Sequence, residues 1–273
     1  MNIFTAGSWF QELQALVCDK IEELEALGDD GWSEPKRMKS PNKTTREGWH
    51  QEHKVMYGEV FEKGTVNFSS VTGEFDKDFA KQIPGTNQSR KYRATGISIV
   101  LHFKNPMVPA MHFNTRMIET GVTWYGGGFD ITPCIEDSRY KKWYHNKCKE
   151  VCDKYDATYY EKFSKACDEY FYLPHRQETR GIGGLFFEYN DPEHMSFDFI
   201  KDVGKQFIHI MESTVIRNYG QKYTQKDKDI QLIKRGRYVE FNLMYDRGTK
   251  FGLQTGGNMD AILMSLPPEA RWK

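Results

Sequence analysis

Hydrophobic residues recur at steps of three and four near the N-terminus, which is the pattern of an amphipathic helix. The pattern predicts a helix over residues 8–27, and Gly28 then stands where helices commonly end. A second pattern of this kind predicts a long helix over residues 196–219. Residues 29–55 are polar, and we expect a mobile loop there. The predicted buried positions are Phe10, Leu13, Val17, Ile21, Leu24 and Leu27 in the first helix and Phe197, Ile200, Val203, Phe207, Ile210 and Val215 in the second.

From about residue 57 to residue 132 the period changes to two, which is typical of strands. In "YRATGISIVLHF", residues 92–103, large apolar residues alternate with small or polar ones. A second strand places His112, Asn114 and Arg116 on one face, because residues two apart point the same way. If the two strands pair, their polar faces meet. The first strand carries Gly96, Ser98, Val100 and His102 on one face and Ile97, Ile99, Leu101 and Phe103 on the other.

The remaining segments complete the predicted architecture. Residues 137–172 are expected to be mostly helical, residues 181–190 a strand, and residues 237–249 a further strand with a turn at 246–248. Strands and helices do not alternate regularly, so the order favours an α+β fold. We expect a large, mainly antiparallel β-sheet flanked by α-helices on both sides. No linker-like stretch divides the chain, so residues 1–273 are predicted to form a single domain.

Composition narrows the class of protein. Lys plus Arg and Asp plus Glu number 38 each, so no net charge draws the chain to nucleic acid or to anionic lipid. No apolar run reaches the length of a membrane span, and the N-terminus lacks the pattern of a secretory signal. We therefore expect no transmembrane segment and a cytoplasmic protein. Five cysteines, an odd count without compact spacing, fit free thiols in a reducing compartment.

The predicted polar face carries residue types that are unusual for a solvated surface. A solvated sheet face, which is the alternative for any one of these residues, usually carries Lys, Glu and Thr. Ser, His, Asn and Arg beside a glycine-rich strand instead favour a surface that binds a ligand or performs catalysis. The residues concerned are Ser98, His102, His112, Asn114 and Arg116.

The stretch "WYGGGFDITP", residues 124–133, interrupts a well-filled strand with three glycines and then adds Asp130. Glycine packs nothing, so it leaves space for a flat or large ligand, or else it marks a bulge or a barrel corner. A carboxylate at the edge of a partly apolar pocket needs a partner. Arg116 or Arg180 is a candidate partner for Asp130, and a ligand with several N–H donors is another.

The segment "PHRQETRGIGGLFF" brings Arg176 and Arg180 close to a second set of glycines. Guanidinium groups bind carboxylates bidentately, which predicts carboxylates on the ligand, but a charged helix end explains the two arginines equally well. Cys148 and Cys152 lie one helical turn apart and fit core thiols better than a zinc site. Imidazoles bind zinc, iron and copper, so four histidines are candidates for a metal site, although no short zinc motif joins them. They are His102, His112, His145 and His175.

Several long segments together resemble one family, the oxygen-dependent coproporphyrinogen III oxidases of haem biosynthesis. They are "VFEKGTVNFS", "ATGISIVLHFKNPMVPAMHFNTR", "WYGGGFDITP", "KACDEYFYLPHRQETRGIGGLFFE", "RYVEFNLMYDRGTKFGLQTGG" and "ILMSLPPEARW". The resemblance covers nearly the whole chain. It implies an oxidoreductase that acts on CH–CH groups with oxygen as acceptor. The reaction converts two propionates of coproporphyrinogen III to vinyl groups, giving protoporphyrinogen IX, CO2 and hydrogen peroxide.

The resemblance also implies partners and roles for particular residues. It implies a homodimer, with molecular oxygen as co-substrate and no other required cofactor; a divalent metal is the alternative that remains open. His112 would be the proton donor, Asp130 the acid that holds the pyrrole N–H groups, and Arg116 the third catalytic candidate. The implied substrate contacts are Ser98, Asn114, Thr115, Arg116, Arg180, Gly256, Gly257 and Asn258, and the implied metal positions are His102, His112, His145 and His175.

Two departures from the family pattern keep rival interpretations open. Asn258 stands where the family usually has Arg, and residues 117–123 form a shorter loop than in bacterial relatives. A non-catalytic tetrapyrrole-binding protein is therefore one alternative. A metal-dependent oxygenase built on the four histidines is the other.

Overall fold

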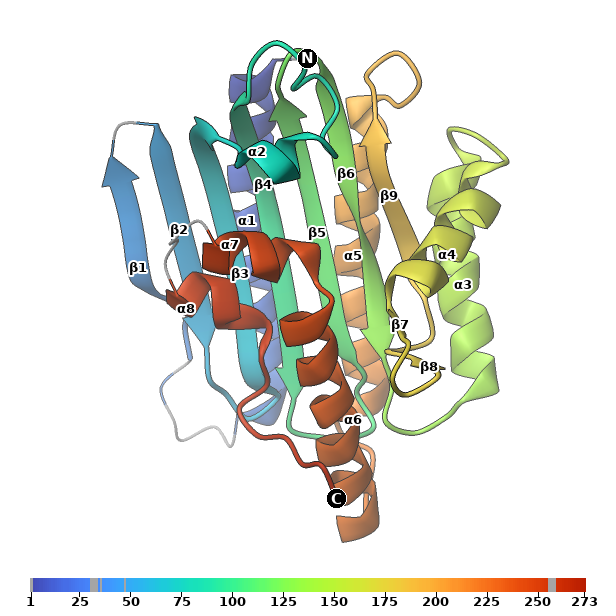
Figure 1. Ribbon diagram of the computed structural model, residues 1–273. Coiled ribbons are helices and arrows are strands. Elements are labelled where there is room, and N and C mark those ends of the chain that lie inside the picture. The colour runs from blue at the N-terminus through green and yellow to red at the C-terminus, as the bar shows by residue number, and fades with distance from the viewer. Residues whose placement is uncertain (1, 30–33, 35, 47, 255–258) are drawn as a thin grey trace.

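The fold is built on one large sheet, seen in a computed structural model that describes residues 2–29, 34, 36–46, 48–254 and 259–273. Its seven strands run in the order β1-β2-β3-β4-β5-β6-β9, and every neighbouring pair is antiparallel (Figure 1). The strands are β1 (Lys39–Arg46), β2 (Trp49–Met56), β3 (Phe61–Glu74), β4 (Lys91–Phe103), β5 (Ala110–Glu119), β6 (Thr123–Thr132) and β9 (Gly184–Asn190), and a separate pair is formed by β7 (Tyr172–Leu173) and β8 (Glu178–Thr179).

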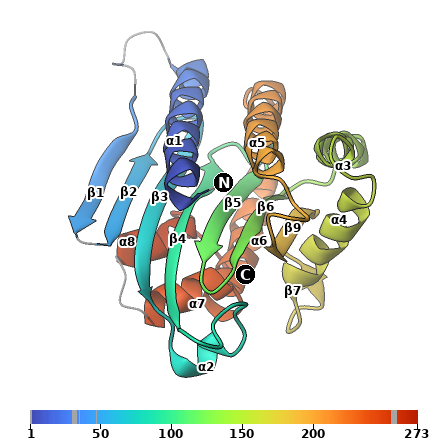
Figure 2. The ribbon, with the colours of Figure 1, turned by 90° about the horizontal axis from the view of Figure 1, so that it is seen from above.

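Helices cover both faces of the sheet, as the α+β prediction required. Figure 2 shows α1 and α5 on one face and α6, α7 and α8 on the other, while α3 and α4 lie beside the β9 edge. The helices are α1 (Ile3–Glu25), α2 (Lys77–Ala80), α3 (Ser138–Asp153), α4 (Tyr159–Tyr170), α5 (Phe197–Asn218), α6 (Gln225–Met244), α7 (Arg247–Gln254) and α8 (Met259–Ile262), with 3-10 turns at Ala26–Gly28 and Leu263–Ser265.

The main hydrophobic core lies between the sheet and the helix pair α1 and α5. Phe10 of α1 and Ile99 of β4 are buried in this core, and the ring centre of Phe207 of α5 lies 4.9 Å from that of Phe113 of β5. This confirms the predicted face of β4. Because side chains alternate along a strand, the small and polar residues of β4 and β5 point the opposite way, toward α6, α7 and α8. Because the core covers one face of the sheet, only the face toward α6, α7 and α8 is available for a functional site.

Two predicted segments were wrong. Residues 39–46 and 49–55, expected as part of a loop, belong to β1, at the edge of the sheet, and to β2 beside it. These strands are polar on both faces, so the alternation that identifies a half-buried strand is missing. Residues 237–249, expected as a strand, belong to α6 and α7. Thr224 and Asp227 form a capping box at the start of α6, which is a helix signal that the aromatic residues further along concealed.

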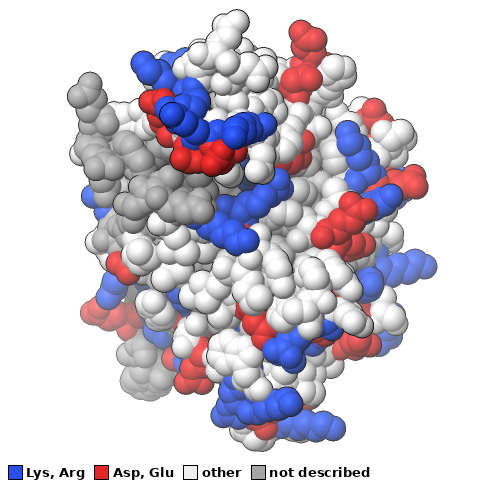
Figure 3. All heavy atoms as spheres, viewed as in Figure 1, with Lys and Arg blue, Asp and Glu red and all other residues white. Residues whose placement is uncertain are grey.

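Surface properties agree with the balanced composition. On the face seen in Figure 3, positive and negative side chains are interspersed. None of the helices in the described part of the chain is both long and apolar enough to cross a membrane. All five cysteines are free, and Cys148 and Cys152 are buried. Cys148 and Cys152 are therefore core thiols, as predicted.

Candidate active site

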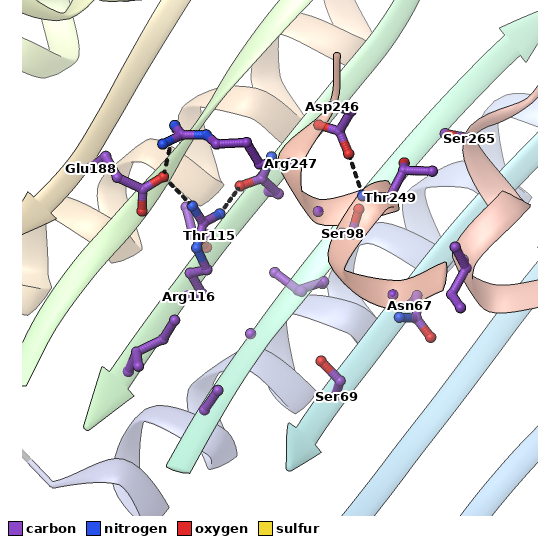
Figure 4. Close-up of a pocket in the computed structure, with 18 of the residues that line it drawn as sticks. Asn67, Ser69, Ser98, Thr115, Arg116, Glu188, Asp246, Arg247, Thr249 and Ser265 are labelled. Carbon is purple, nitrogen blue, oxygen red and sulfur yellow. Dashed lines mark hydrogen bonds and ion pairs between the residues drawn. The ribbon is translucent and has the colours of Figure 1, made fainter. Parts of the chain in front are cut away.

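A cavity of about 420 Å3 opens between the sheet and the helices α6, α7 and α8. Its lining includes apolar side chains such as Phe75, Ile83 and Trp124, which belong to one buried cluster, and a set of polar side chains. Figure 4 shows strand residues of the floor facing residues of the last helices. The polar residues lining it include Ser98, His112, Asn114, Thr115, Arg116, Arg180, Glu188, Asn242, Asp246 and Arg247. The predicted substrate contacts from β4 and β5 are thus brought together with Arg180.

Strand register explains why the polar residues of β5 gather there. Asn114 lies opposite Ser98 of β4 and Gly128 of β6. His112 lies opposite Asp130 of β6. Directly opposed residues on one face have neighbouring side chains. The alternating polar residues of β5 therefore meet the functional groups of β4 and β6 only because the three strands pair in this register.

Asp130 pairs with both His112 and Arg180, so the arginine partner considered from sequence is the one found. Its Oδ1 lies 2.8 Å from His112 Nδ1 and 2.5 Å from Arg180 Nη2, and its Oδ2 lies 3.2 Å from Arg180 Nε. Asp130 and Arg180 are almost fully buried. Asp130 is not on the described cavity wall, but both of its partners are. The carboxylate therefore meets the cavity through the imidazole and the guanidinium group.

Charge and burial act in opposite directions on this pair. Burial alone would raise the pKa of Asp130, but Arg180 and then His112 outweigh it and hold that pKa below its ordinary value. Burial likewise opposes the charged form of Arg180, and Asp130 raises its pKa above the ordinary value. Both groups are therefore ionised at neutral pH. The guanidinium group also lies 4.0 Å from the Phe171 ring centre and 4.4 Å from that of Tyr238.

A second charged cluster, which sequence reasoning missed, joins Arg116, Glu188 and Arg247. Arg116 Nη2 lies 2.5 Å and Arg247 Nη2 3.4 Å from Glu188 Oε2 (Figure 4). Arg116 Nη1 also donates to Asn114 Oδ1 at 2.9 Å, and Asn114 Nδ2 lies 3.1 Å from His112 Nε2. The two charged clusters are thus joined by hydrogen bonds through Asn114.

The glycines of β6 make room for this cluster and for the neighbouring strand, not for a ligand. A Cβ at Gly126 would overlap Glu188 Oε1, and one at Gly128, where φ is 143°, would overlap the Leu185 carbonyl oxygen. None of the three glycines is among the described cavity-lining residues. The prediction of space for a ligand at this point is therefore wrong, and its alternative, a bulge, is confirmed by the register shift between β6 and β9.

The same bulge also sets the direction of the Glu188 side chain. Between the pairs Tyr125–Asn190 and Gly127–Phe187, β9 has one more residue than β6. The extra residue allows Tyr189 to adopt a φ of 56°, which is uncommon for a residue with a side chain. Bulges rotate side chains out of the regular alternation, and they are frequent beside functional sites. The only sequence signal for Glu188 is its place at the end of the glycine-rich strand "GIGGLFFEYN".

The remaining predicted substrate contacts differ in accessibility. Ser98 and Thr115 both line the cavity, and Thr115 Oγ1 is a buried hydroxyl without a hydrogen-bond partner among the described residues. Gly256, Gly257 and Asn258 lie outside the described residues. The substrate-binding role of each remains a prediction.

The four candidate metal-ligating histidines have separate hydrogen-bond partners. His102 Nε2 lies 2.9 Å from the Ser265 carbonyl oxygen, and burial lowers its pKa to about 3. His145 Nε2 lies 2.8 Å from the Ile182 carbonyl oxygen, and His175 Nε2 lies 2.7 Å from Glu240 Oε2. The described part of the chain holds no group of three or more His, Cys, Asp or Glu residues placed to hold one metal ion. Metal binding by these histidines stays a prediction.

Comparisons with known proteins agree on one family. The family model for coproporphyrinogen III oxidase matches residues 5–273. The chain belongs to the coproporphyrinogen III oxidase family. A relative in Rickettsia bellii (strain OSU 85-389), named oxygen-dependent coproporphyrinogen-III oxidase, is 50% identical over 99% of this chain and 98% of its own length.

Two further relatives carry the same name. The Rickettsia felis (strain ATCC VR-1525 / URRWXCal2) protein is 47% identical over 98% of this chain and 97% of its own length. The Rickettsia rickettsii (strain Sheila Smith) protein is 48% identical over 97% of this chain and 96% of its own length. Family membership therefore rests on nearly the whole sequence and not on a local motif.

Proposed function

We propose that this chain catalyses the oxygen-dependent oxidative decarboxylation of coproporphyrinogen III to protoporphyrinogen IX in haem biosynthesis. The observation that carries the proposal is near-full-length similarity to relatives named as oxygen-dependent oxidases of this substrate. A cavity of about 420 Å3 lined by apolar side chains and by Arg116, Arg180 and Arg247 suits a tetrapyrrole that bears propionates. The names of these relatives do not favour the alternative of a non-catalytic binding protein.

The chemistry balances with oxygen as the only oxidant. Each propionate loses CO2 and one hydrogen from the carbon attached to the ring, so a carbon–carbon and a carbon–hydrogen bond break and a vinyl group forms. O2 accepts the two electrons and, with that hydrogen and one further proton, leaves as hydrogen peroxide. The reduced tetrapyrrole is electron-rich and supplies electrons to O2 itself. The protein's part is then to orient the substrate and to stabilise developing charge.

His112 is the proposed proton donor on the cavity side. A carboxylate can only accept a hydrogen bond, so the Nδ1 that faces Asp130 carries a proton. The other nitrogen, Nε2, faces Asn114 and is the atom at which a proton is taken up or released. Asp130 fixes the orientation of the His112 ring through its contact with Nδ1. Arg180 in turn keeps Asp130 ionised, because each charge is buried with the other.

The cofactor and assembly assignments are part of the proposal. Molecular oxygen is the co-substrate, and a divalent metal at His102, His112, His145 and His175 is the alternative that chelation tests. We also propose that residues 1–273 act as one domain, in the cytoplasm, as a homodimer. Exposed Leu243, Met244 and Leu253, which lie close together in sequence on α6 and α7, support a self-association surface.

The decisive experiment is aerobic turnover of coproporphyrinogen III with and without EDTA, followed by protoporphyrin fluorescence after oxidation of the product. We expect turnover that stops when oxygen is removed. Equal rates in both samples support a reaction without metal, whereas loss with EDTA and recovery with one metal transfers the central role to the histidines. Substrate binding without oxygen uptake contradicts the proposed function.

Asp130→Asn then tests the buried pair, since it keeps the shape and removes the charge. We expect substrate binding to be retained and kcat to fall by about a hundredfold or more, the scale of one preorganised electrostatic group. Asp198→Asn, at an exposed aspartate outside the described cavity wall, controls for the loss of a carboxylate elsewhere in the fold. Near-normal turnover of Asp130→Asn excludes a role for its charge in the reaction.

A further inference from the structure

A second and much smaller cavity lies between α6 and the sheet. It has a volume of about 10 Å3, and none of its lining residues is among the described residues that line the large cavity. About 10–15 Å3 is the least space that holds one water molecule. The small cavity therefore has room for a single molecule of that size. Its lining includes His102, Ala110, Thr132, Gln231, Arg235 and Tyr238.

Strand register explains where this cavity comes from. Ala110 of β5 lies opposite Thr132 of β6. On the other side, Leu101 of β4 lies opposite Met111 of β5. The next residue of β4, His102, is therefore beside Ala110. These three lining residues form one row across the sheet, and its middle member has only a methyl side chain. The space above Ala110 is what the larger side chains of the row and of α6 leave open.

Five of the lining residues carry a buried polar atom that has no hydrogen-bond partner among the described residues. None of the five is more than 4% exposed. Buried polar atoms are nearly always hydrogen-bonded, because an unpaired one loses its hydration without compensation. So many of them around one small cavity indicate a common partner inside it. They are His102 Nδ1, Thr132 Oγ1, Gln231 Oε1, Arg235 Nη1 and Tyr238 OH.

The balance of donors and acceptors identifies the kind of partner. Arg235 Nη1 can only donate, and the Thr132 hydroxyl can donate as well. The Gln231 side chain presents its oxygen, which only accepts, because its Nε2 already donates to a backbone carbonyl oxygen at 2.9 Å. His102 Nε2 lies 2.9 Å from the Ser265 carbonyl oxygen and so carries a proton, which leaves Nδ1 of the neutral ring as an acceptor. Two donors and two acceptors therefore surround the space.

An ion of either sign would meet one unfavourable contact there. An anion would face the Gln231 oxygen, and a cation would face the Arg235 guanidinium group. The charge of Arg235 is moreover already paired, since its Nη2 contacts Glu62. A water molecule accepts and donates up to two hydrogen bonds each, so it meets neither unfavourable contact.

We propose that one water molecule binds in this small cavity and joins α6 to the strands β4 and β6. The water accepts hydrogen bonds from Arg235 Nη1 and Thr132 Oγ1. It donates to Gln231 Oε1 and His102 Nδ1. This site does not depend on the proposed function.

The water also supports the buried pair of the large cavity. Tyr238 lines the small cavity, and its ring centre lies 4.4 Å from the Arg180 guanidinium group. The Tyr238 hydroxyl lies beside the Asn242 side chain and is not assigned to the water. A water that fixes α6 against the sheet thus fixes the helix that carries part of the aromatic wall around Arg180.

X-ray crystallography of the full chain tests the site directly, with crystals grown in sodium bromide in place of sodium chloride. We expect one electron-density peak in the cavity, about 2.7–3.2 Å from both Arg235 Nη1 and Gln231 Oε1, without anomalous signal at the bromine absorption edge. An anomalous peak identifies a halide ion and overturns the assignment to water. A cavity without a peak, or direct hydrogen bonds among the four side chains, overturns the site altogether.

A double-variant cycle tests the bridge in solution. Thr132→Val removes the hydroxyl at nearly constant shape, and Gln231→Met removes the amide; the Thr132 hydroxyl and the Gln231 oxygen have no direct hydrogen bond to each other. We expect each change alone to lower the equilibrium constant for folding, taken from urea denaturation, by about fivefold to tenfold or more. The loss in the double variant should be at least about threefold smaller than the product of the two losses, because the first change already disrupts the shared water. A loss equal to the product overturns the bridge.

Thr214→Val is the matched control for this cycle. Thr214 is also a buried threonine, but it lies on α5, on the other face of the sheet (Figure 2), and its hydroxyl lies 2.8 Å from that of Tyr140. Combined with Gln231→Met, it should give a loss equal to the product of the single losses, since the two side chains share no partner. Coupling as large as that of Thr132→Val would mean that Gln231→Met disturbs the whole fold, and it counts against the bridge.

Discussion

The cavity has two arginine–carboxylate clusters that differ in burial, and the difference separates their roles. Asp130 and Arg180 are each 1% exposed at their side chains, whereas Arg247 is 47% exposed. Arg180 uses two nitrogen atoms on Asp130 and lies against aromatic rings, so little of it is left for a ligand. The cluster around Glu188 retains free donors. A buried ion pair of this kind can alter the electrostatic environment of a neighbouring group. A half-exposed ion pair can exchange one of its partners for another charged group.

The largest effect should come from breaking the buried pair. Arg180→Met leaves Asp130 buried without its main counter-charge, so we expect the free energy of unfolding to fall by about 3–5 kcal/mol. Urea denaturation measures it, with Arg139→Met as the control for loss of an exposed arginine. The double variant Asp130→Leu with Arg180→Met should regain part of the loss, because no unpaired charge remains. A loss below about 1 kcal/mol for Arg180→Met contradicts the view that the pair is desolvated.

The next largest effect is expected from substituting the glycines of β6, which lie near the two clusters. Gly128→Ala places a Cβ against a backbone carbonyl at a φ of 143°, so we expect a loss of about 2–3 kcal/mol in unfolding free energy. The Cβ of Gly126→Ala meets the movable side-chain ends of Glu188 and Arg116, so its cost should stay near about 1 kcal/mol and appear mainly as a raised KM.

Gly220→Ala is the matched control, because a Cβ there meets no atom within 4 Å. Urea denaturation of the three variants and their KM values decide the comparison. If Gly126→Ala and Gly128→Ala lower the unfolding free energy equally, the two glycines are required for the same structural reason.

The difference between the clusters also marks the limit of what the sequence could predict. The alternation in β4 and β5 correctly placed Ser98, Asn114 and Arg116 on one face, because a strand with one buried face imposes a period of two. The pairing of Asp130 with Arg180 remained one of several options, since register between β6 and the segment before β9 is not a local property. Glu188 and Arg247 went unnoticed because a bulge and a helix start, not a periodic pattern, bring them together.

Errors in secondary structure have the same origin. The segment 237–249 is rich in aromatic and β-branched residues, which favour strands, yet it continues a helix that begins at a capping box. Tertiary packing decided the outcome: Tyr238 and Phe241 are buried, and both lie against the Arg180 guanidinium group. The misassigned segment therefore supplies the aromatic wall of the buried pair.

A third prediction uses pH to separate the charge of Asp130 from its shape. Its pKa is lowered in the folded protein, so its stabilising contribution is complete above the unfolded value of about 4 and is lost as the pH falls through the folded pKa. The stability gap between the wild type and Asp130→Asn, taken from urea midpoints between about pH 6 and about pH 3, should therefore narrow toward low pH. A constant gap would mean that hydrogen-bond geometry, not charge, stabilises the pair.

The smallest expected effect is the salt dependence of the cost of Glu188→Gln, which should differ clearly from that of Arg180→Met. Glu188→Gln should lower the unfolding free energy by less than about 1 kcal/mol, because its partners Arg116 and Arg247 keep 32% and 47% of their side chains in contact with water. Raising NaCl from about 0.05 M to about 0.5 M shortens the screening length and should shrink even that difference. The cost of Arg180→Met should hardly change, since salt does not reach a pair that is 1% exposed. If both costs respond alike to salt, burial does not distinguish the two clusters.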